Sequence, residues 1–497
     1  MDSQTRRDFL KRIGLAAASV PALSILPGCK KDTEEAVETE VEQAARYAGK
    51  KPNIIFIMAD DLGYAHLGCY GQKIIKTPHI DNIAAEGMKF TQVYSGCTVC
   101  APCRSVLMTG LHMGHTSVRE NSGGVPLLAE DVTVAEVLKN AGYATGGYGK
   151  WGIGDAGTDG MATKQGFDEF FGYYHQVHAH YYYPEYLWHN DEKVVLEGNE
   201  NDGRKQYSHD LIMERAMSFI RSNKDQPFFC YIPITIPHTE LLVPEKSMRK
   251  YAGRFDEPTP WVDKRRHYAD QAQPRAAFAA MVTHLDDGVG EIMALLKELK
   301  IDDNTIVFFT SDNGGQGSGG PDAKFFEANK PLRGYKGHMY EGGIRVPMVV
   351  RWPGKIKDGT INDHISYFPD IMPTLAEMAG AKVPAKTDGI SIVPTLLGED
   401  VIGRNQKEHK FLYWELGGEG NLSQAVRMGR WKAVRPKGGA ALELYDLETD
   451  IGETKNLAEE RSDIMAEIEA YLKTARTPMR AQGEPEGVEW DWRNPMY

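Results

Sequence analysis

From residue 52 onward, continuous apolar runs alternate with segments whose apolar residues recur at helical spacing. The run NIIFIMADD at 53–61 is hydrophobic until it ends in two aspartates, a pattern typical of a strand buried on both faces of a parallel sheet. Residues 276–300 place apolar side chains three and four positions apart, which predicts a long amphipathic helix. Further runs that predict buried strands lie at 227–238, 304–314 and 346–354.

Two shorter helices are predicted between these strands. At 77–87, Thr77 stands at the N-cap position, Pro78 at the first helical position and Gly87 at the end. Residues 132–142 place valines and a leucine on one helical face and also end in glycine. Strands that alternate with helices predict an α/β fold with a large, mostly parallel sheet sandwiched by helices.

Near the end of the chain, the pattern of apolar and polar residues changes. Residues 424–435 and 442–450 predict antiparallel strands, and residues 461–475 predict a closing helix. We therefore expect a large domain at 51–395 and a smaller C-terminal α+β domain at 396–497 that carries an antiparallel sheet.

The N-terminus has the features of an export signal. The paired arginines Arg6 and Arg7 precede an apolar stretch at 13–26 that is too short to span a bilayer. The sequence LPGC, which ends at Cys29, is similar to a bacterial lipobox, in which the cysteine is lipidated. These features predict a twin-arginine lipoprotein signal peptide at 1–28, with a short membrane-anchoring helix as the alternative.

A charged segment follows the predicted signal. Residues 29–50 contain few large apolar side chains, which is typical of a flexible tether. We expect an exported bacterial lipoprotein, in the periplasm or at the outer membrane or cell surface, that is held to the membrane by its N-terminal lipid.

Composition narrows the class of ligand. The chain of 497 residues is 41% hydrophobic and 25% charged, as ordinary globular proteins are, and it carries a formal net charge of -12. Because no basic domain stands out, binding to nucleic acid is not expected. An anionic substrate would have to be met by local cations rather than by the overall field.

Three of the six cysteines, Cys97, Cys100 and Cys103, have the spacing C-x2-C-x2-C. Bacterial ferredoxins use this run to bind an iron–sulfur cluster, but their fourth cysteine is missing here. The competing interpretation is that one of the three cysteines does covalent chemistry, and the spacing alone does not decide between the two.

Polar residues stand where three of the predicted strands end. They are Asp60-Asp61, Pro237-His238 and Asp312-Asn313. In parallel sheets, ligands bind beyond the carboxyl ends of the strands. Three carboxylates and one amide oxygen are hard ligands that suit Ca2+ or Mg2+ better than Zn2+. For either acidic pair taken alone, a solvated turn is the alternative.

Residues 100–110, CAPCRSVLMTG, resemble the signature of the type I sulfatases, which are formylglycine-dependent, arylsulfatase-like members of the alkaline phosphatase superfamily. Other segments that resemble this family are NIIFIMADDLGY, GKWGIG, FFTSDNGG, LRGYKGHMYEGGIRVP, WKAVR and ELYDLETDIGETKNLA. The resemblance covers nearly the whole chain from residue 51. It implies the alkaline-phosphatase-like fold and a sulfuric ester hydrolase, with O-sulfated carbohydrates as the expected substrates.

The resemblance also implies a role for each site residue. A cytosolic maturation enzyme would oxidise Cys100 to formylglycine, whose hydrated form attacks sulfur, and Cys97 and Cys103 would be bystanders. His238 would protonate the leaving alcohol. One Ca2+ ion per chain, with Mg2+ as the alternative, would be bound by Asp60, Asp61, Cys100, Asp312 and Asn313. The other implied catalytic residues are Arg104, which holds the formylglycine, and Lys150 and Lys336, which bind the sulfate oxygens.

The chain departs from the family at Gly152, where the family motif GKWHLG has a histidine. Histidines that are candidates for replacing it or for binding the substrate are His66, His115, His178 and His180. The aromatic run at 173–188 suggests stacking on a sugar, and a packed aromatic loop is the alternative.

Two other functions stay open at this point. One is a phosphate mono- or diester hydrolase of the same superfamily, although zinc enzymes of that kind have more His and Asp ligands and a Ser or Thr nucleophile. The other is a catalytically impaired lipoprotein that binds sulfated glycans. Gly152 favours this second function, and the retention of the other expected residues disfavours it.

Overall fold

The computed structural model describes residues 50–121, 125–264, 267–418 and 420–479, all of them within one compact unit, Val41–Tyr497. The predicted export and lipidation residues Arg6, Arg7 and Cys29 lie outside the described residues. No helix within the described ranges is long and apolar enough to cross a bilayer.

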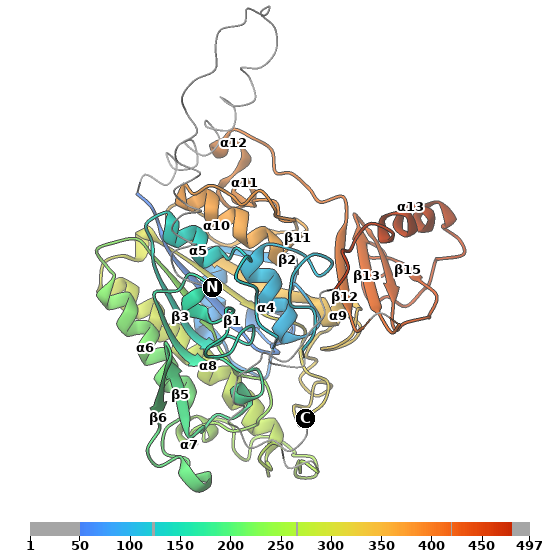
Figure 1. Ribbon diagram of the computed structural model, residues 1–497. Coiled ribbons are helices and arrows are strands. Elements are labelled where there is room, and N and C mark those ends of the chain that lie inside the picture. Colours follow the sequence, from blue (N-terminus) through green and yellow to red (C-terminus); the bar gives the residue numbers. More distant parts are fainter. Residues whose placement is uncertain (1–49, 122–124, 265–266, 419, 480–497) are drawn as a thin grey trace, which may run out of the picture. The chain divides into compact units, whose positions relative to one another are not determined.

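A large mixed sheet of eleven strands forms the centre of this unit (Figure 1). Its spatial order is β10 (Thr360–Asn362), β2 (Met88–Tyr94), β9 (Arg345–Arg351), β8 (Thr305–Ser311), β1 (Asn53–Ala59), β7 (Phe228–Pro233), β3 (Ala144–Lys150), β4 (Glu169–Tyr173), β5 (Tyr186–His189) and β6 (Glu192–Val195), and β11 (Ser366–Tyr367) also pairs with β2. β1 pairs in parallel with both β7 and β8, and β3 pairs in parallel with β7 and β4. The predicted α/β class with a mostly parallel sheet is confirmed.

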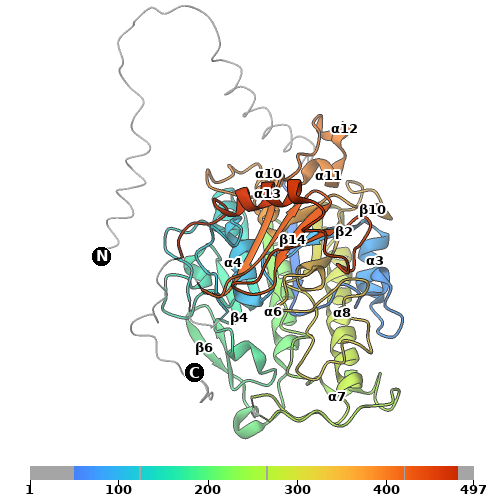
Figure 2. The same cartoon turned by 90° about the vertical axis from the view of Figure 1, so that its right-hand side faces the viewer.

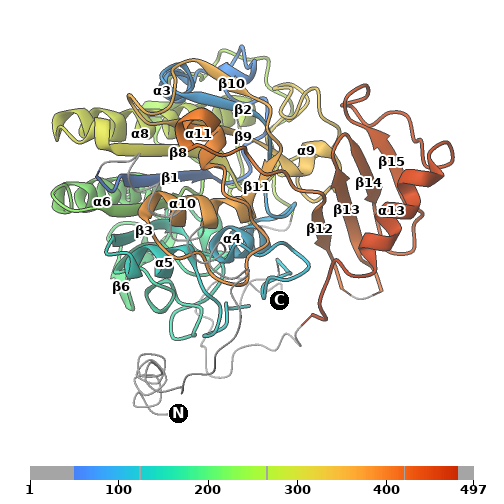
Figure 3. The same ribbon diagram turned by 90° about the horizontal axis from the view of Figure 1, so that it is seen from above.

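Helices cover both faces of the sheet because the buried strands send alternate side chains to opposite sides. In β1, Phe56 and Met58 face one core, whereas Ile55 and Ile57 face the other. The helices of the first core are α4 (Cys100–Thr109), α5 (Val134–Asn140), α10 (Ile371–Ala379) and α11 (Val393–Leu397), and those of the second are α3 (Pro78–Ala85), α6 (Ser208–Ser222) and α8 (Pro274–Glu298). Figure 3 looks onto the face that α4, α5 and α10 cover.

The predicted helices form, with one local difference. α8 spans Pro274–Glu298, close to the predicted range of 276–300. α3 begins at Pro78, but the side chain of Thr77 does not cap it. The Thr77 hydroxyl instead accepts a hydrogen bond from the Gly68 N–H and donates one to Asp81, which ties the helix to the preceding loop. The remaining short α-helices are α7 (Glu245–Met248), α9 (Glu341–Ile344) and α12 (Glu399–Ile402).

A separate sheet of four antiparallel strands follows, as predicted. Its strands are β12 (Leu412–Leu416), β13 (Ser423–Met428), β14 (Trp431–Arg435) and β15 (Glu443–Asp446). The helix α13 (Ser462–Leu472) packs Ile468 against one face of this sheet, and Figure 2 shows α13 beside β14. The opposite face contributes Trp414 to a core shared with Tyr94 and Tyr367. The predicted domain boundary at 395 stays a prediction.

A buried ion group joins the small sheet to the large one. Lys432 Nζ lies 2.9 Å from a carboxylate oxygen of Glu341 and 2.9 Å from one of Glu453, and all three side chains are fully buried. Glu341 also accepts a hydrogen bond of 2.6 Å from the hydroxyl of Tyr94 on β2. The small sheet is therefore fixed to α9, which follows the segment of Lys336.

We expect replacement of Lys432 by methionine to lower the free energy of unfolding by about 3–5 kcal/mol, because buried Glu453 loses its paired cation and buried Glu341 keeps only its pair with Arg345. Lys410 offers a matched control in the same domain, since its pair with Glu467 is exposed. Lys410→Met should change the stability by about 0–1 kcal/mol. Equilibrium urea unfolding of both variants measures the difference, and equal effects would contradict a structural role for the buried group.

Candidate active site

The carboxyl ends of β1 and β8 bring four polar side chains to one edge of the sheet. The parallel register sets Ala59 opposite Ser311, so the residues that follow the two strands lie side by side. Asp61 has a φ of 62°, in the left-handed region that aspartate tolerates better than most residues, and its N–H donates to Asp312 Oδ1 at 3.1 Å. The four side chains are those of Asp60, Asp61, Asp312 and Asn313, and none is more than 1% exposed.

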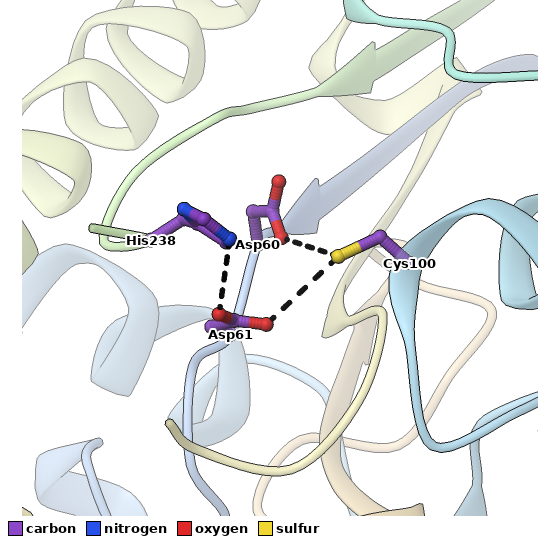
Figure 4. Close-up of side chains that lie close together, drawn as sticks. All are labelled: Asp60, Asp61, Cys100 and His238. Atoms are coloured by element: carbon purple, nitrogen blue, oxygen red, sulfur yellow. Dashed lines mark hydrogen bonds and ion pairs between the residues drawn. The ribbon is translucent and has the colours of Figure 1, made fainter. Parts of the chain in front are cut away.

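Cys100 faces these acids from the first residue of α4. Its Sγ lies 3.2 Å from Asp60 Oδ1 and 4.0 Å from Asp61 Oδ1 (Figure 4), and 3.3 Å from Lys336 Nζ. Burial, together with the nearby charges of Asp312 and Asp60, raises the pKa of the Cys100 thiol. The unmodified side chain is therefore a neutral thiol and a poor nucleophile.

The other two cysteines of the C-x2-C-x2-C run have separate partners. Cys103 donates to the carbonyl of Asp312 at 2.7 Å, and Cys97 contacts the carbonyl of Glu415 at 3.8 Å. Because the three sulfurs are engaged at different places, the geometry does not support an iron–sulfur cluster.

Three cations balance the three carboxylates, of which Lys150 and Arg104 are fully buried and Lys336 is 16% exposed. Lys150 Nζ lies 2.6 Å from Asp60 Oδ2. Arg104 Nη2 lies 2.9 Å from Asp312 Oδ2, and Lys336 Nζ lies 2.8 Å from Asp61. Arg104 Nη1 also donates to the carbonyl of Lys150 at 2.6 Å, which links α4 to the end of β3. These cations come from three different segments, so the fold must be complete before the charges are paired.

The pKa values of Asp60 and Asp312 shift in opposite directions in this crowded site. Burial opposes ionisation of Asp60, but the charges of Lys150 and Arg104 hold its pKa well below the usual value. Burial and the adjacent charge of Asp60 raise the pKa of Asp312 to about 7. A further positive charge at this place would therefore be stabilised.

His238 follows β7 and completes the cluster. Its Nε2 lies 3.5 Å from Asp61 Oδ2, and its Nδ1 donates to the carbonyl of Thr239 (Figure 4). This bond places the ring proton of neutral His238 on Nδ1 and leaves Nε2 able to exchange a proton with a ligand. Burial, and then the charge of Lys336, lower the pKa of His238 to about 4.

The donor set fits a divalent cation. Asn313 Nδ2 donates to Asp61 Oδ1 at 2.7 Å, whereas the buried Oδ1 of Asn313 has no hydrogen-bond partner among the described residues. Asp60, Asp61, Cys100 and His238 also offer donor atoms within 4.8 Å of one another. An unpaired amide oxygen beside three carboxylates is the hard, oxygen-rich set that Ca2+ and Mg2+ prefer.

The four candidate substrate histidines lie in different surroundings. His180 stacks on His238, with ring centroids 4.4 Å apart and ring planes at 16°. His66 accepts a hydrogen bond from the Gly63 N–H at 2.9 Å and packs on Phe278 of α8, at 4.9 Å between ring centroids. His178 packs between Tyr173 and Tyr186, and His115 pairs with Asp388 at 2.9 Å. The geometry thus brings His180 to the cluster and gives the other three packing or pairing contacts elsewhere.

His112, His115 and Asp388 form a second cluster of donor atoms. His112 Nδ1 accepts the N–H of Gly114 at 3.0 Å, so the proton of the neutral ring sits on Nε2, the nitrogen nearer Asp388. A protonated Nε2 cannot bind a metal. The cluster therefore links two loops through hydrogen bonds.

Two residues beside His180, His267 and Tyr268, were not predicted as site residues from the sequence. His180 Nδ1 lies 3.2 Å from His267 Nε2 and 3.4 Å from the Tyr268 hydroxyl. Burial raises the pKa of Tyr268, and the charges that act on it include Lys336 and Asp61, which places it at the active centre. Both residues lie on an irregular segment, and a single sequence offers no periodicity or motif that marks them.

Solved structures of other proteins have the same fold as this chain. The structure of Ps i-CgsB in complex with k-i-k-neocarrahexaose has a TM-score of 0.71 and 30% sequence identity, covering 85% of this chain and 93% of that one. The PsFucS1 sulfatase from Pseudoalteromonas sp. has a TM-score of 0.66 at 23% identity, covering 94% of this chain and 99% of that one, and it shares the fold. This fold, together with the sulfatase family model that matches the chain, defines a sulfuric ester hydrolase.

The sequence comparisons agree. The model of the sulfatase family matches residues 52–381, and that of the N-sulphoglucosamine sulphohydrolase C-terminal region matches residues 335–482. N-acetylgalactosamine-6-O-sulfatase of Bacteroides thetaiotaomicron is 29% identical, over 94% of this chain and 100% of its own length. Arylsulfatase A of Homo sapiens is 32% identical, over 82% of this chain and 83% of its own length. The chain belongs to the sulfatase family.

We expect Asp312→Ala to abolish binding of the divalent cation, because a ligand charge is lost and Arg104 loses the nearer of its two carboxylate partners. Asp388→Ala is the matched control, a carboxylate paired with histidine outside the cluster, and it should keep the metal. Elemental analysis of the purified variants measures the ion. Full metal content in Asp312→Ala, or stoichiometric zinc or iron in the unmutated protein, would contradict the assignment.

Proposed function

We propose that this protein hydrolyses the sulfate esters of carbohydrates, using a formylglycine made from Cys100 and a bound Ca2+ ion. The observation that carries the proposal is the place of Cys100, whose sulfur lies between Asp60 and Asp61 and beside Lys336. Among the similar proteins, one is named for action on N-acetylgalactosamine 6-O-sulfate and another was solved with a neocarrahexaose. These names support a sulfated sugar as the substrate class.

Two groups supply reactivity that the twenty amino acids lack. A formylglycine hydrate would supply an oxygen nucleophile in place of the thiol of Cys100. A divalent ion held by Asp60, Asp61, Asp312 and Asn313 would supply positive charge that lowers the pKa of oxygens it contacts.

The chain's own cations bind the sulfate group. Lys150 ends at Asp60 and Lys336 ends at Asp61. A sulfate ester that entered between them would accept hydrogen bonds from both ammonium groups, which stabilise the charge on its oxygens in the transition state. Arg104 stays paired with Asp312 and fixes the helix that carries residue 100.

His238 is placed to transfer a proton to the leaving oxygen. In the unliganded protein its ring is neutral, because burial and Lys336 lower its pKa to about 4. A bound sulfate ester adds a negative charge near the ring, which favours the imidazolium. The Nδ1–H bond to the Thr239 carbonyl fixes the ring, so that Nε2 donates the proton as the alcohol leaves.

The two alternative functions are less favoured. A zinc-dependent phosphate ester hydrolase would need more histidine ligands than the oxygen-rich cluster offers. A protein that only binds sulfated glycans would have no use for a buried residue 100 surrounded by paired charges.

We expect Cys100→Ala and Cys100→Ser to release no sulfate, although the four ligands Asp60, Asp61, Asp312 and Asn313 are still present to bind the metal. The fold should be retained, because serine is nearly isosteric with cysteine at this buried position. Ion chromatography of sulfate released from a panel of sulfated monosaccharides measures activity. The mass of the tryptic peptide with residue 100, after expression with a maturation enzyme, tests the aldehyde. Turnover by Cys100→Ala, or an active enzyme with an intact thiol, would refute the proposal.

We expect His180→Ala to impair sulfated sugars far more than a generic aryl sulfate. His180 Nε2 is buried without a hydrogen-bond partner among the described residues, and a sugar hydroxyl would satisfy it. Sites built to bind a hydroxyl reject analogues that lack it, so kcat/KM on the sugar should fall by about 100-fold or more.

His178→Ala serves as the control for this experiment, since His178 packs against Tyr173 and Tyr186 rather than His238. It should affect the two substrates alike. An equal loss on both substrates in His180→Ala would assign His180 to the sulfate chemistry instead of to sugar recognition.

A further inference from the structure

Gly152 stands two residues beyond Lys150 and has no room for a side chain. A β-carbon at this position would lie 2.7 Å from Gln176 Oε1 and 3.6 Å from Arg104 Cδ. The backbone of Gly152 also has a φ of 75°, in the left-handed region. The carboxamide of Gln176 therefore fills the space that a side chain at position 152 would occupy, beside the stem of Arg104.

A chain of hydrogen bonds leads from Gln176 to the first turn of α4. Gln176 Nε2 donates to Asn121 Oδ1 at 3.4 Å, and Asn121 Oδ1 accepts the backbone N–H of Ala101 at 2.9 Å. Because a backbone N–H only donates, the atom of Asn121 that faces Ala101 is its oxygen. Gln176 must then present its nitrogen to Asn121, which leaves its Oε1 at Gly152.

These contacts act on a helix end that lacks a local cap. The N-cap residue of α4 is Val99, whose side chain makes no capping hydrogen bond. The first N–H groups of a helix have no partner inside the helix and need an acceptor from elsewhere. Asn121 supplies that acceptor to Ala101, the residue next to Cys100.

Burial makes the arrangement rigid. Gln176 is only 2% exposed, and its Oε1 has no hydrogen-bond partner within the described part of the chain. A buried carboxamide with one long hydrogen bond gains little energy by itself. The position of Gln176 beside Arg104 and Gly152 is explained if its side chain keeps Asn121 and the first turn of α4 in place.

We propose that Asn121 and Gln176 are positioning residues, which hold residue 100 in register with Lys150 across the space left by Gly152. The inference rests on the proposed function only in taking residue 100 as the reacting residue. Neither residue touches the carboxylate cluster in any hydrogen bond or ion pair that the described residues make, so both act through α4.

The first test compares Asn121→Asp, which keeps the acceptor oxygen, with Asn121→Leu, which removes it at similar size. We expect Asn121→Leu to lower kcat by about 10–100-fold with little change in KM, because misplacement of a reacting group by a fraction of an ångström is costly. Asn121→Asp should stay within a few-fold of the unmutated enzyme. Metal content and conversion of residue 100, checked by mass, should be the same in all three proteins.

A second readout needs no activity. Hydrogen exchange of the peptide that spans 99–109 should be faster in Asn121→Leu than in Asn121→Asp, because the Ala101 amide loses its acceptor. Equal exchange and equal kcat in both variants would overturn the proposal. If the unmutated protein released no sulfate from any substrate, the proposed function would fail, whereas the exchange comparison would still decide the role of Asn121.

The fit of Gln176 against Gly152 gives a double-mutant test. Gly152→Ala should lower kcat strongly, because its β-carbon meets Gln176 Oε1. Gln176→Ala in that background frees the space, so the double variant should lose less activity than the two single losses combined. Additive losses would show that the two residues are not coupled and would overturn this part of the proposal.

Discussion

The parallel pairing of β1 with β8 imposes the constraint on which the site depends. It forces carboxylates from two strand ends into one buried place, where each ion costs several kcal/mol of lost hydration. The fold offsets this cost with three cations from three segments: Arg104 on α4, Lys150 at the end of β3, and Lys336 in the segment before α9. Removing any one of them would deprive a buried carboxylate of its nearest cation.

The small sheet takes part in this arrangement although none of its residues pairs with the acid cluster. Lys432 holds Glu341, which opens α9 a few residues after Lys336. Arg427 of β13 donates to the hydroxyl of Tyr94 on β2, which in turn contacts Glu341. The position of Lys336 is thus influenced from the C-terminal end of the chain, by contacts far from it in sequence.

The sequence was sufficient for the parts of the structure that depend on local pattern. β1, β7 and β8 are mostly apolar and fully buried, so their ends, and the acids at Asp60 and Asp312, could be predicted from the sequence alone. The helix α4 could not be predicted from hydrophobic periodicity, because all ten of its residues are buried and none of its faces is exposed and polar. Its short motif resembles a known family, and that resemblance, rather than periodicity, assigned a role to Cys100.

The remaining site residues depend on tertiary contacts that no local pattern records. Asn121, Gln176 and Tyr268 lie outside the regular helices and strands and reach the centre through long-range packing. The same limitation applies to His66 and His115, whose side chains are engaged by Gly63 and Asp388. A histidine near a motif in the sequence has several partners available, and only the fold selects among them.

The complete burial of Cys100 has a consequence for the order of events in biogenesis. Its side chain is 0% exposed and is enclosed by residues from β1, β8 and the segment of Lys336. Under the proposed function, a maturation enzyme would have to reach the thiol before the chain closes around it, so the proposed oxidation would compete in time with closure of the sheet edge. Mutations that speed folding would then lower the yield of active protein, and slow synthesis past residue 312 would raise it.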